Sequence, residues 1–272
     1  MKPQHYSTLQ VARAVGVHPN TVRMYEVWGF LPPVPRAPND YRVYTEFHID
    51  QMRLARTALH GGWPGRNVRV SAVALVRQSA SGDLGGALEQ AYRHLAVVQA
   101  ERAQAEGAAT LLERWAQGTA IDATAKPLRI KEAAQLLGVT SDMLRNWERN
   151  GLLKVPRDPH SRYRCYGAAE LDRVRVIRTL SRAGYSNMAI LRMLRRLDAG
   201  ERYNLREALD TPDPHEDVFT AADHWLSSLQ SQEQRAKDMI AQLEAMIVRT
   251  GCSIHPRMRA HRGLRCLALA PG

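Results

Sequence analysis

The side chains with the clearest chemical potential are arginines that recur at a fixed spacing. A residue at position n is matched at n + 122, so that Arg23 recurs as Arg145, and Tyr41-Arg42 recurs as Tyr163-Arg164. Guanidinium groups bind phosphate, which duplex DNA presents at every step. The sequence shows no glycine-rich phosphate loop and no His, Asp and Ser set at an informative spacing. The residues therefore favour DNA binding over enzyme activity, and we expect no cofactor.

The whole segment around these arginines is present twice. Further matched positions are Gly16, Glu26, Gly29, Leu31 and Tyr44, which recur as Gly138, Glu148, Gly151, Leu153 and Tyr166. The register holds without a gap as far as Gly62 and Gly184. Agreement at so many positions, turn glycines included, indicates one module present twice.

Each copy begins with the pattern of two short helices. The first helix, over residues 9–15 or 130–137, ends at a glycine that can adopt a left-handed cap. The second starts at Pro19 or behind the N-cap residue Thr140, and it ends at Gly29 or Gly151. Two short helices joined by a tight turn are typical of a helix-turn-helix, whose second helix enters the major groove.

A Pro- and Arg-rich stretch then leads to residues 39–44 or 160–166, which alternate as a strand does. We expect a small β-hairpin wing with its tyrosines packed inward, namely Tyr41, Tyr44, Tyr163 and Tyr166. Amphipathic helices are expected over residues 45–59 and 167–182, followed by shorter ones near 68–78 and 187–197. The fold class is mainly α with small β-hairpin wings.

These residues resemble the MerR family of transcription regulators. The family pattern of Arg-Tyr-Tyr-Glu, Gly-Leu-Leu and Gly-Tyr-Arg-x-Tyr is similar to residues 23–26, 29–31 and 41–44, and again to 145–148, 151–153 and 163–166. Met24 and Asn146 stand where the family has its first Tyr. Asp40 and Arg162 stand where it has the wing Gly.

The resemblance, together with the helix geometry, indicates which side chains meet DNA. Amide, hydroxyl and imidazole groups early on the second helices are the candidate base readers: His18, Asn20, Thr21, Thr140, Ser141 and Asp142. Phosphate and wing contacts are expected from Arg23, Tyr25, Arg36, Arg42, Arg145, Arg157, Arg162 and Arg164. Two alternatives stay open. Arg23 and Arg145 could pair with Glu26 and Glu148 on their own helices, and His18 could serve only as a helix cap.

A long helix with a 3–4 spaced stripe follows each module. The first stripe consists of Leu88, Ala91, Leu95, Val98, Arg102, Ala105, Ala109, Leu112 and Ala116. The second consists of Val218, Ala222, Trp225, Leu229, Gln232, Ala236, Met239, Leu243 and Met246. Packing is the expected role of Trp115 and Trp225, with an effector pocket as the alternative.

In the MerR family such helices pair antiparallel between two subunits. Here the linker between the first long helix and the second module (118–127) can reach about 30 Å, which lets the helices pair within one chain. We therefore expect an intramolecular pseudo-dimer, with a homodimer as the alternative. Its two readers would lie about 34 Å apart, one DNA turn. Because the second helices differ in sequence, the two half-sites should differ.

Charge alternates along the chain, which carries a formal net charge of +11. Residues 1–80 and 128–200 are basic, 81–127 and 201–247 are acidic, and the end is basic again. Two separate basic segments suggest two polyanion-binding surfaces. The N-terminus lacks an apolar signal region, no apolar run is long enough to span a membrane, and the three cysteines fit a reducing compartment. We expect a cytoplasmic protein with no membrane association.

The C-terminal segment contains Cys252, His255, His261 and Cys266, which are side chains that can bind zinc or copper. Four arginines lie among them and would repel a cation. A basic tail that adds DNA affinity is therefore the preferred interpretation, and a metal site is the alternative.

The expected organisation is a first winged helix-turn-helix domain (1–80), a coiled-coil helix (84–117), a linker (118–127), a second winged domain (128–200), a second coiled-coil helix (213–250) and a basic tail (251–272). The expected function is sequence-specific regulation of transcription of the MerR type, by binding and distorting promoter DNA together with RNA polymerase. An architectural or recombination-accessory DNA-binding protein, or a resistance protein that binds a small molecule, are the alternatives.

Overall fold

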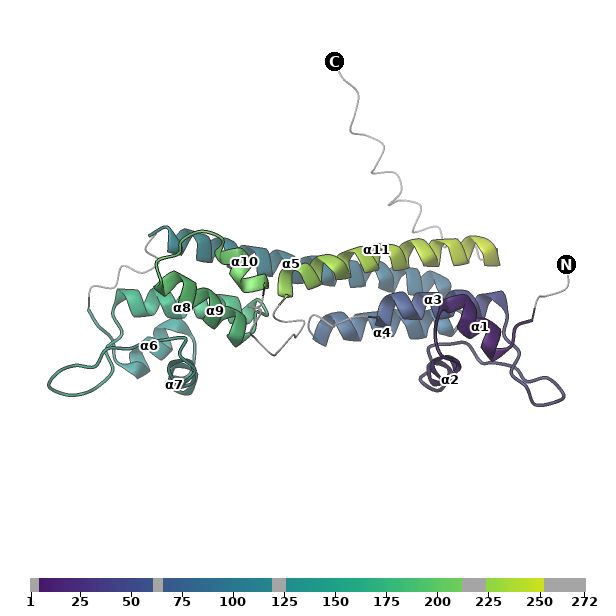
Figure 1. Ribbon diagram of the computed structural model, residues 1–272, viewed down its shortest axis with the longest axis horizontal. Helices are drawn as coiled ribbons and strands as arrows, with labels where there is room; N and C mark the ends of the chain where they lie inside the picture. The colour runs from purple at the N-terminus through teal and green to yellow at the C-terminus, as the bar shows by residue number, and fades with distance from the viewer. Residues whose placement is uncertain (1–4, 61–65, 119–125, 212–223, 252–272) are drawn as a thin grey trace, which may run out of the picture. The chain divides into compact units, whose positions relative to one another are not determined.

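The computed structural model describes residues 5–60, 66–118, 126–211 and 224–251, and these residues are mainly helical (Figure 1). The described part divides into two units. Unit 1 contains residues 5–60, 66–97 and 232–251, and unit 2 contains residues 98–118, 126–211 and 224–231. Each unit holds one copy of the repeated module.

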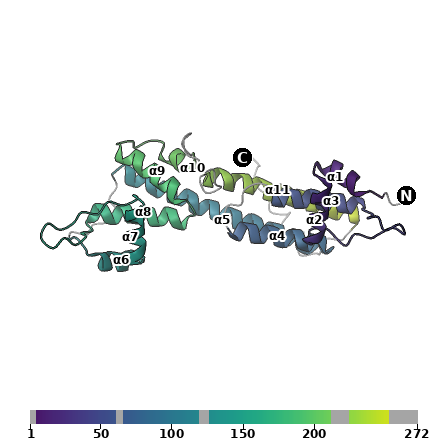
Figure 2. The same ribbon diagram turned by 60° about the horizontal axis from the view of Figure 1, so that its bottom comes forward.

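Unit 1 is built from the first module and from parts of two long helices. The module helices are α1 (Thr8–Val15), α2 (Pro19–Val27), α3 (Glu46–Leu59) and α4 (Arg66–Ala80). The long helices are α5 (Leu84–Ala116), which contributes its first part, and α11 (Trp225–Thr250), which contributes its last part. Figure 2 shows α1 and α2 of this unit from a second side.

Unit 2 repeats this construction with the second module. Its helices are α6 (Ile130–Leu137), α7 (Ser141–Arg149), α8 (Ala168–Arg182) and α9 (Asn187–Asp198). A further short helix, α10 (Leu205–Asp210), was not predicted from the sequence. The last part of α5 and the first turns of α11 complete the unit.

Local signals in the sequence explain where the short helices begin and end. The Ser7 hydroxyl accepts a hydrogen bond from the backbone N–H of Gln10, and the Gln10 side chain accepts one from the N–H of Ser7. This reciprocal capping box satisfies donors that the first turn leaves unpaired. Gly16 and Gly138 end α1 and α6 at φ values of 65° and 58°, a left-handed conformation that glycine adopts without a steric penalty. Both caps were predicted.

The core of unit 1 includes the end of α11. Leu243 and Met246 of α11 belong to one buried cluster with Leu54, Leu75 and Leu88 of the first module and α5. The contact also has polar members. The Gln242 amide donates to the Thr57 hydroxyl at 2.9 Å, and Arg249 pairs with the buried carboxylate of Asp50 at 3.0 Å. The helix that follows the second module therefore completes the core of the first.

The core of unit 2 includes the end of α5 in the same way. Ala109 and Leu112 are buried in one cluster with Leu137, Leu171 and Ile177 of the second module. The Tyr185 hydroxyl donates to the carbonyl of Ala105 at 3.2 Å. Burial raises the pKa of Tyr185, so its hydroxyl keeps the proton that this bond requires. The helix that follows the first module thus completes the core of the second.

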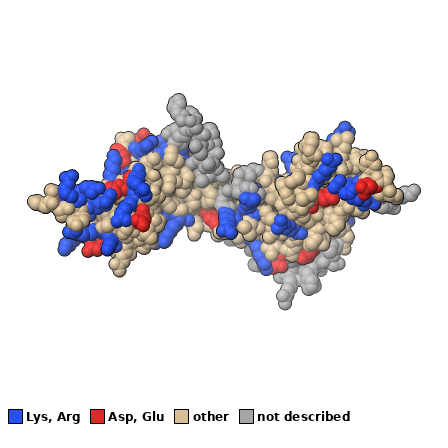
Figure 3. All heavy atoms as spheres, turned by 90° about the horizontal axis from the view of Figure 1, so that it is seen from below, with Lys and Arg blue, Asp and Glu red and all other residues tan. Residues whose placement is uncertain are grey.

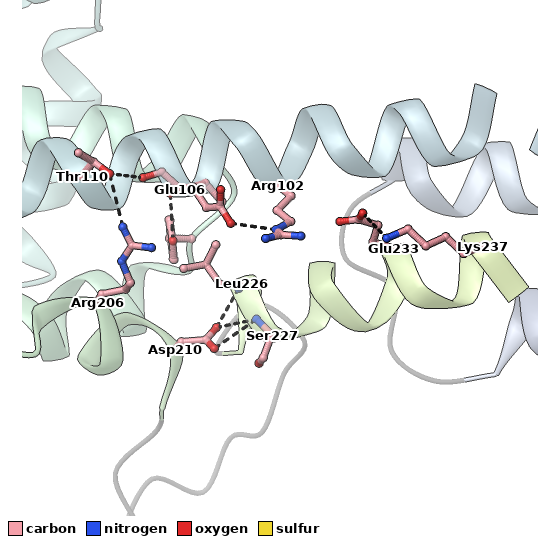
Figure 4. Close-up of polar contacts among 11 residues, drawn as sticks. Arg102, Glu106, Thr110, Arg206, Asp210, Leu226, Ser227, Glu233 and Lys237 are labelled. Carbon is pink, nitrogen blue, oxygen red and sulfur yellow. Dashed lines mark hydrogen bonds and ion pairs between the residues drawn. The ribbon is translucent and has the colours of Figure 1, made fainter. Parts of the chain in front are cut away.

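A carboxylate on α10 holds the start of α11 in unit 2. Asp210 accepts hydrogen bonds from the backbone N–H groups of Leu226 and Ser227, the first at 2.8 Å (Figure 4). An acidic group at a helix N-terminus satisfies unpaired donors and complements the helix dipole. Arg206, also on α10, reaches Glu113 and Thr110 of α5. The short helix therefore ties α11 to α5.

The repeat is also present in three dimensions, although its chemistry differs. In unit 1 the buried amide of Gln51 donates to the carbonyls of Phe30 and Val76, at 3.0 and 2.9 Å. Arg173 stands at the matching position in unit 2, where it donates to the carbonyl of Leu152 at 2.8 Å and pairs with Asp198. Phe30 and Val76 correspond to Leu152 and Asp198. Gln51 and Arg173 therefore each connect their own helix, α3 or α8, to the residue behind the reader helix and to α4 or α9.

The wings differ from the prediction. Within the described residues each wing is a loop closed by one antiparallel bridge, Arg36 to Arg42 or Arg157 to Arg164, and the expected β-hairpin ladder is not seen. Asp40 and Arg162 hold left-handed conformations, with φ of 63° and 61°. The turn thus keeps the backbone shape that a glycine would adopt more easily.

The predicted packing of the wing tyrosines was half wrong. Tyr44 and Tyr166 are completely buried, whereas Tyr41 and Tyr163 are 74% and 60% exposed. Residues three apart on an extended chain point to opposite faces, so the two rings of a wing cannot share one. The Tyr163 ring instead lies under the guanidinium of Arg129, 4.6 Å from its centroid.

Candidate nucleic-acid interface

The second helix of each module, α2 or α7, is the candidate reader of DNA. The imidazole Nδ1 of His18 accepts a hydrogen bond from the N–H of Asn20, and the Thr140 hydroxyl accepts one from the N–H of Met143. Both side chains therefore cap their helices, which for His18 is the alternative that the sequence had left open. Contact of either residue with DNA stays a prediction.

Each reader helix presents a stripe of exposed side chains on the face away from its buried residues, which are Val22 in α2 and Leu144 and Trp147 in α7. The stripe of α2 consists of Asn20, Arg23, Met24 and Val27, and that of α7 consists of Asp142, Arg145, Asn146 and Arg149. Sequence reasoning did not assign base contacts to Met24, Val27, Asn146 or Arg149. The helical period of 3.6 residues counted from Asn20 would have indicated them.

The arginine in each stripe is held by the residue three positions before it. Arg23 donates to the amide oxygen of Asn20 at 3.1 Å, and Arg145 pairs with Asp142 at 2.6 Å. The alternative that they pair with Glu26 and Glu148 is wrong, because those two carboxylates bind wing arginines. Arg23 and Arg145 are exposed and are oriented from the first turn of the reader helix.

Each wing is joined to its reader helix by an ion pair. Arg42 Nε lies 2.7 Å from Glu26, and Arg164 Nε lies 2.6 Å from Glu148. All four side chains are only about a quarter exposed, at 22–28%. The hydrogen bond to Glu26 raises the pKa of the Arg42 guanidinium above its usual value. This geometry holds the wing at a fixed place beside α2 or α7, whether or not these arginines also touch phosphate.

The remaining wing arginines are exposed. Arg36 binds both the carboxylate and the backbone carbonyl of Asp40 at 3.1 Å, and Arg157 reaches the carbonyl of Arg162 at 3.4 Å. Figure 3 shows Lys and Arg side chains exposed on both units in the view from below, with Asp and Glu side chains among them. Such a surface attracts the phosphate backbone, so it supports the predicted phosphate contacts without testing them.

Tyr25 of α2 packs against neighbouring aromatic rings. Its half-buried ring packs edge-on against Phe30, with centroids 5.7 Å apart, and tilted against Trp28 at 6.0 Å. Burial raises the pKa of the Tyr25 hydroxyl. The equivalent Trp147 is a core residue, 4% exposed. Position 25 thus serves packing in both modules, and its predicted phosphate contact remains a prediction.

The two tryptophans considered for an effector site differ in environment. Trp225 is buried, donates from Nε1 to the carbonyl of Ala183 at 2.6 Å, and fills the space beside Gly184, where a Cβ atom would meet the indole. It is a packing residue. Trp115 is half-buried and borders a cavity of about 300 Å³ lined also by Lys154, Glu170, Arg173 and Asp198.

The alternative metal site, Cys252, His255, His261 and Cys266, lies outside the described residues. Within residues 5–60, 66–118, 126–211 and 224–251, no group of three or more His, Cys, Asp or Glu is placed to hold a metal ion. Among the same residues no helix is both long and apolar enough to cross a membrane.

The fold and the interface define a DNA-binding protein with two helix-turn-helix modules. Residues 6–70 and 128–197 each match the family described as MerR HTH family regulatory protein. The chain belongs to the MerR family and is a DNA-binding transcription regulator of that type. No solved structure matches it.

Relatives with assigned names agree with this assignment. The mercuric resistance operon regulatory protein of Pseudomonas fluorescens is 30% identical over 130 residues, which cover 48% of this chain and 78% of the relative. A probable heavy metal-dependent transcriptional regulator of Haemophilus influenzae is 30% identical over 117 residues, or 43% and 83% of the two chains. The HTH-type transcriptional regulator CueR of Escherichia coli is 36% identical over 53 residues, or 20% and 39%. These relatives are regulators, a class of protein that is not enzymatic.

Proposed function

We propose that this regulator works as a single-chain pseudo-dimer that binds and distorts promoter DNA for RNA polymerase. In a MerR homodimer the helix that follows one module packs against the other subunit. Here one polypeptide supplies both modules and both helices. The proposal therefore assigns to one chain the two readers that a homodimer obtains from two.

The observation that carries the proposal is the exchange of helices between the modules. The end of α11 is buried in the first module through Leu243 and Met246, and the end of α5 is buried in the second through Ala109 and Leu112. Each large side chain buried in this way contributes roughly 1.5–3 kcal/mol. Because the chain's own helices cover these two surfaces, a second copy could not bind them in the same way.

Two consequences follow for DNA. The readers would be held at a fixed separation, which we propose to be about 34 Å so that both enter the same face of one operator. Distortion of the DNA between them would cost free energy that contacts from exposed arginines such as Arg36 and Arg157 repay. We further propose that the distorted promoter is the form that RNA polymerase engages.

Light scattering on the purified chain and on its operator complex tests the proposal. We expect a mass of 30.6 kDa for the free protein over a wide concentration range and one chain on each operator. Footprinting should show two protected half-sites one helical turn apart with enhanced cleavage between them. A stable dimer that carries four modules, or two chains on one operator, would refute the single-chain arrangement.

A further inference from the structure

The two reader helices present different chemistry at matched positions. Position 20 of α2 matches 142 of α7, 24 matches 146, and 27 matches 149, and all six side chains are exposed. At 3.6 residues per turn the three positions of a helix fall within about 60° of arc. Each arc faces away from the residues that its helix buries. These three pairs therefore form the part of the stripe that can make the modules differ.

Both modules keep the same arginine within the stripe. Arg23 and Arg145 are each held by the side chain three residues earlier, at 3.1 and 2.6 Å. Any contact that this arginine makes is shared, and it cannot distinguish the half-sites. Within the stripe, the differences between the modules come from the three unlike pairs.

The first module presents an amide followed by two apolar side chains. Asn20 accepts from Arg23 through its oxygen, whose second lone pair and amide N–H groups match the N6 and N7 edge of adenine. Met24 and Val27 follow it and are 42% and 75% exposed. Exposed apolar groups on a groove-facing helix have the 5-methyl group of thymine as their natural contact. The chemistry of α2 thus matches A·T pairs.

The second module presents polar groups throughout. Asp142 binds Arg145 through one oxygen, and a carboxylate in the groove accepts from the N4 amino group of cytosine. Asn146 accepts from Asn150 at 3.2 Å and can pair with adenine, as Asn20 can. Arg149, where α2 has Val27, has the shape to bind O6 and N7 of guanine. The chemistry of α7 thus matches a site that contains G·C pairs.

We infer that the operator is asymmetric in base composition, with an A·T half-site read by Asn20, Met24 and Val27, and a half-site containing G·C pairs read by Asp142, Asn146 and Arg149. The inference rests on the proposed function, because it assumes that each module reads one half-site.

Exchange of the stripes between modules tests the inference within one chain. The variant N20D/M24N/V27R gives α2 the side chains of α7, and D142N/N146M/R149V makes the reverse change. Each triple variant keeps the net charge, so the sequence-independent attraction to phosphate is unchanged. The exposed positions make little demand on folding, which helix content and the thermal midpoint would verify. Val70→Asn on α4, at a 59% exposed valine outside the stripes, is the control.

The readout is selection of binding sequences from a random duplex pool, followed by dissociation constants at one fixed salt concentration. Wild type and Val70→Asn should select one A·T half and one half with G·C pairs. The first triple variant should select two halves with G·C pairs, and the second should select two A·T halves. Each variant should bind the wild-type operator at least about tenfold more weakly.

The outcomes separate the inference from the function on which it rests. If wild type selects two half-sites of the same composition, or if both exchanged variants keep the wild-type preference, the base assignment is wrong while duplex binding stands. If wild type selects no sequence at all, the proposed function itself fails. If one variant does not fold, the opposite exchange still tests the assignment in the other module.

Discussion

The ion pair between Glu26 and Arg42 allows two roles of Arg42 to be distinguished. Its atoms lie 2.7 Å apart, and both side chains are about a quarter exposed. If the pair positions the wing, Glu26→Gln weakens DNA binding, because the wing is no longer held beside α2. If Arg42 is only a phosphate ligand, removal of the nearby negative charge leaves binding unchanged or strengthens it. We expect weaker binding.

The expected size follows from the geometry. A hydrogen bond between charged groups contributes roughly 1.5–3 kcal/mol, and partial exposure places this pair near the lower end. A double-mutant cycle of Glu26→Gln and Arg42→Gln should therefore give a coupling of about 1–2 kcal/mol in the free energy of unfolding. If half of this is lost from the bound geometry, the dissociation constant should rise about two- to fivefold.

Urea unfolding monitored by circular dichroism and fluorescence anisotropy with labelled operator are the two measurements. Glu148→Gln with Arg164→Gln repeats the cycle in the second module, where the distance is 2.6 Å. The reasoning is refuted by a coupling below about 0.3 kcal/mol, the ordinary error of additivity, or by tighter DNA binding of Glu26→Gln.

Three further predictions concern stability. Arg162→Gly should stabilise the protein by roughly 0.5–1 kcal/mol, because residue 162 has a φ of 61°. Asp40→Gly should stabilise it less, since Asp tolerates this conformation and pairs with Arg36. Unchanged thermal midpoints of the two variants would contradict this prediction. Leu243→Ala, at a fully buried site, should lower the free energy of unfolding in urea by about 2–5 kcal/mol. Val248→Ala, at a side chain of the same helix that is 78% exposed, should change it by less than about 0.5 kcal/mol. Equal effects would be evidence against packing of α11 on the first module. Burial lowers the pKa of His94 from 6.5 to about 4, so the unfolded chain binds the proton first, and the free energy of unfolding should fall by up to about 3 kcal/mol as the pH drops from 6.5 to 4. His94→Gln should remove this part of the pH dependence. Parallel curves of unfolding free energy against pH for the two proteins would exclude a contribution from His94.

The helices were predictable because their signals are local. The predicted N-cap at Thr140 and the left-handed glycines at positions 16 and 138 act within one turn of chain. The second stripe was also predicted well, since its described members from Trp225 to Met246 are all buried. Apolar periodicity reports which face needs a partner, and the identity of that partner depends on the rest of the fold.

The site was less predictable because it depends on pairs of side chains distant in sequence. Glu26 has a basic partner at i − 3 on its own helix, and nothing local indicates that it binds Arg42 instead. The prediction that both wing tyrosines pack inward was wrong for a different reason, because a spacing of three residues was interpreted as strand alternation. Gln51 and Arg173 were not singled out at all, because their partners are backbone carbonyls and a carboxylate brought together by the tertiary fold.

The exchange of helices also determines when the core of the N-terminal module is complete. Leu243 and Met246 complete the cluster that contains Leu54 and Leu75, and the bond between Thr57 and Gln242 joins residues 185 positions apart. Contacts of such long range form slowly, because a large loop must close first. During synthesis this part of the apolar core therefore stays uncovered until the segment that contains Leu243 and Met246 has left the ribosome. A stop codon before α11 would remove the second long helix and would also leave the module at the opposite end of the polypeptide incomplete.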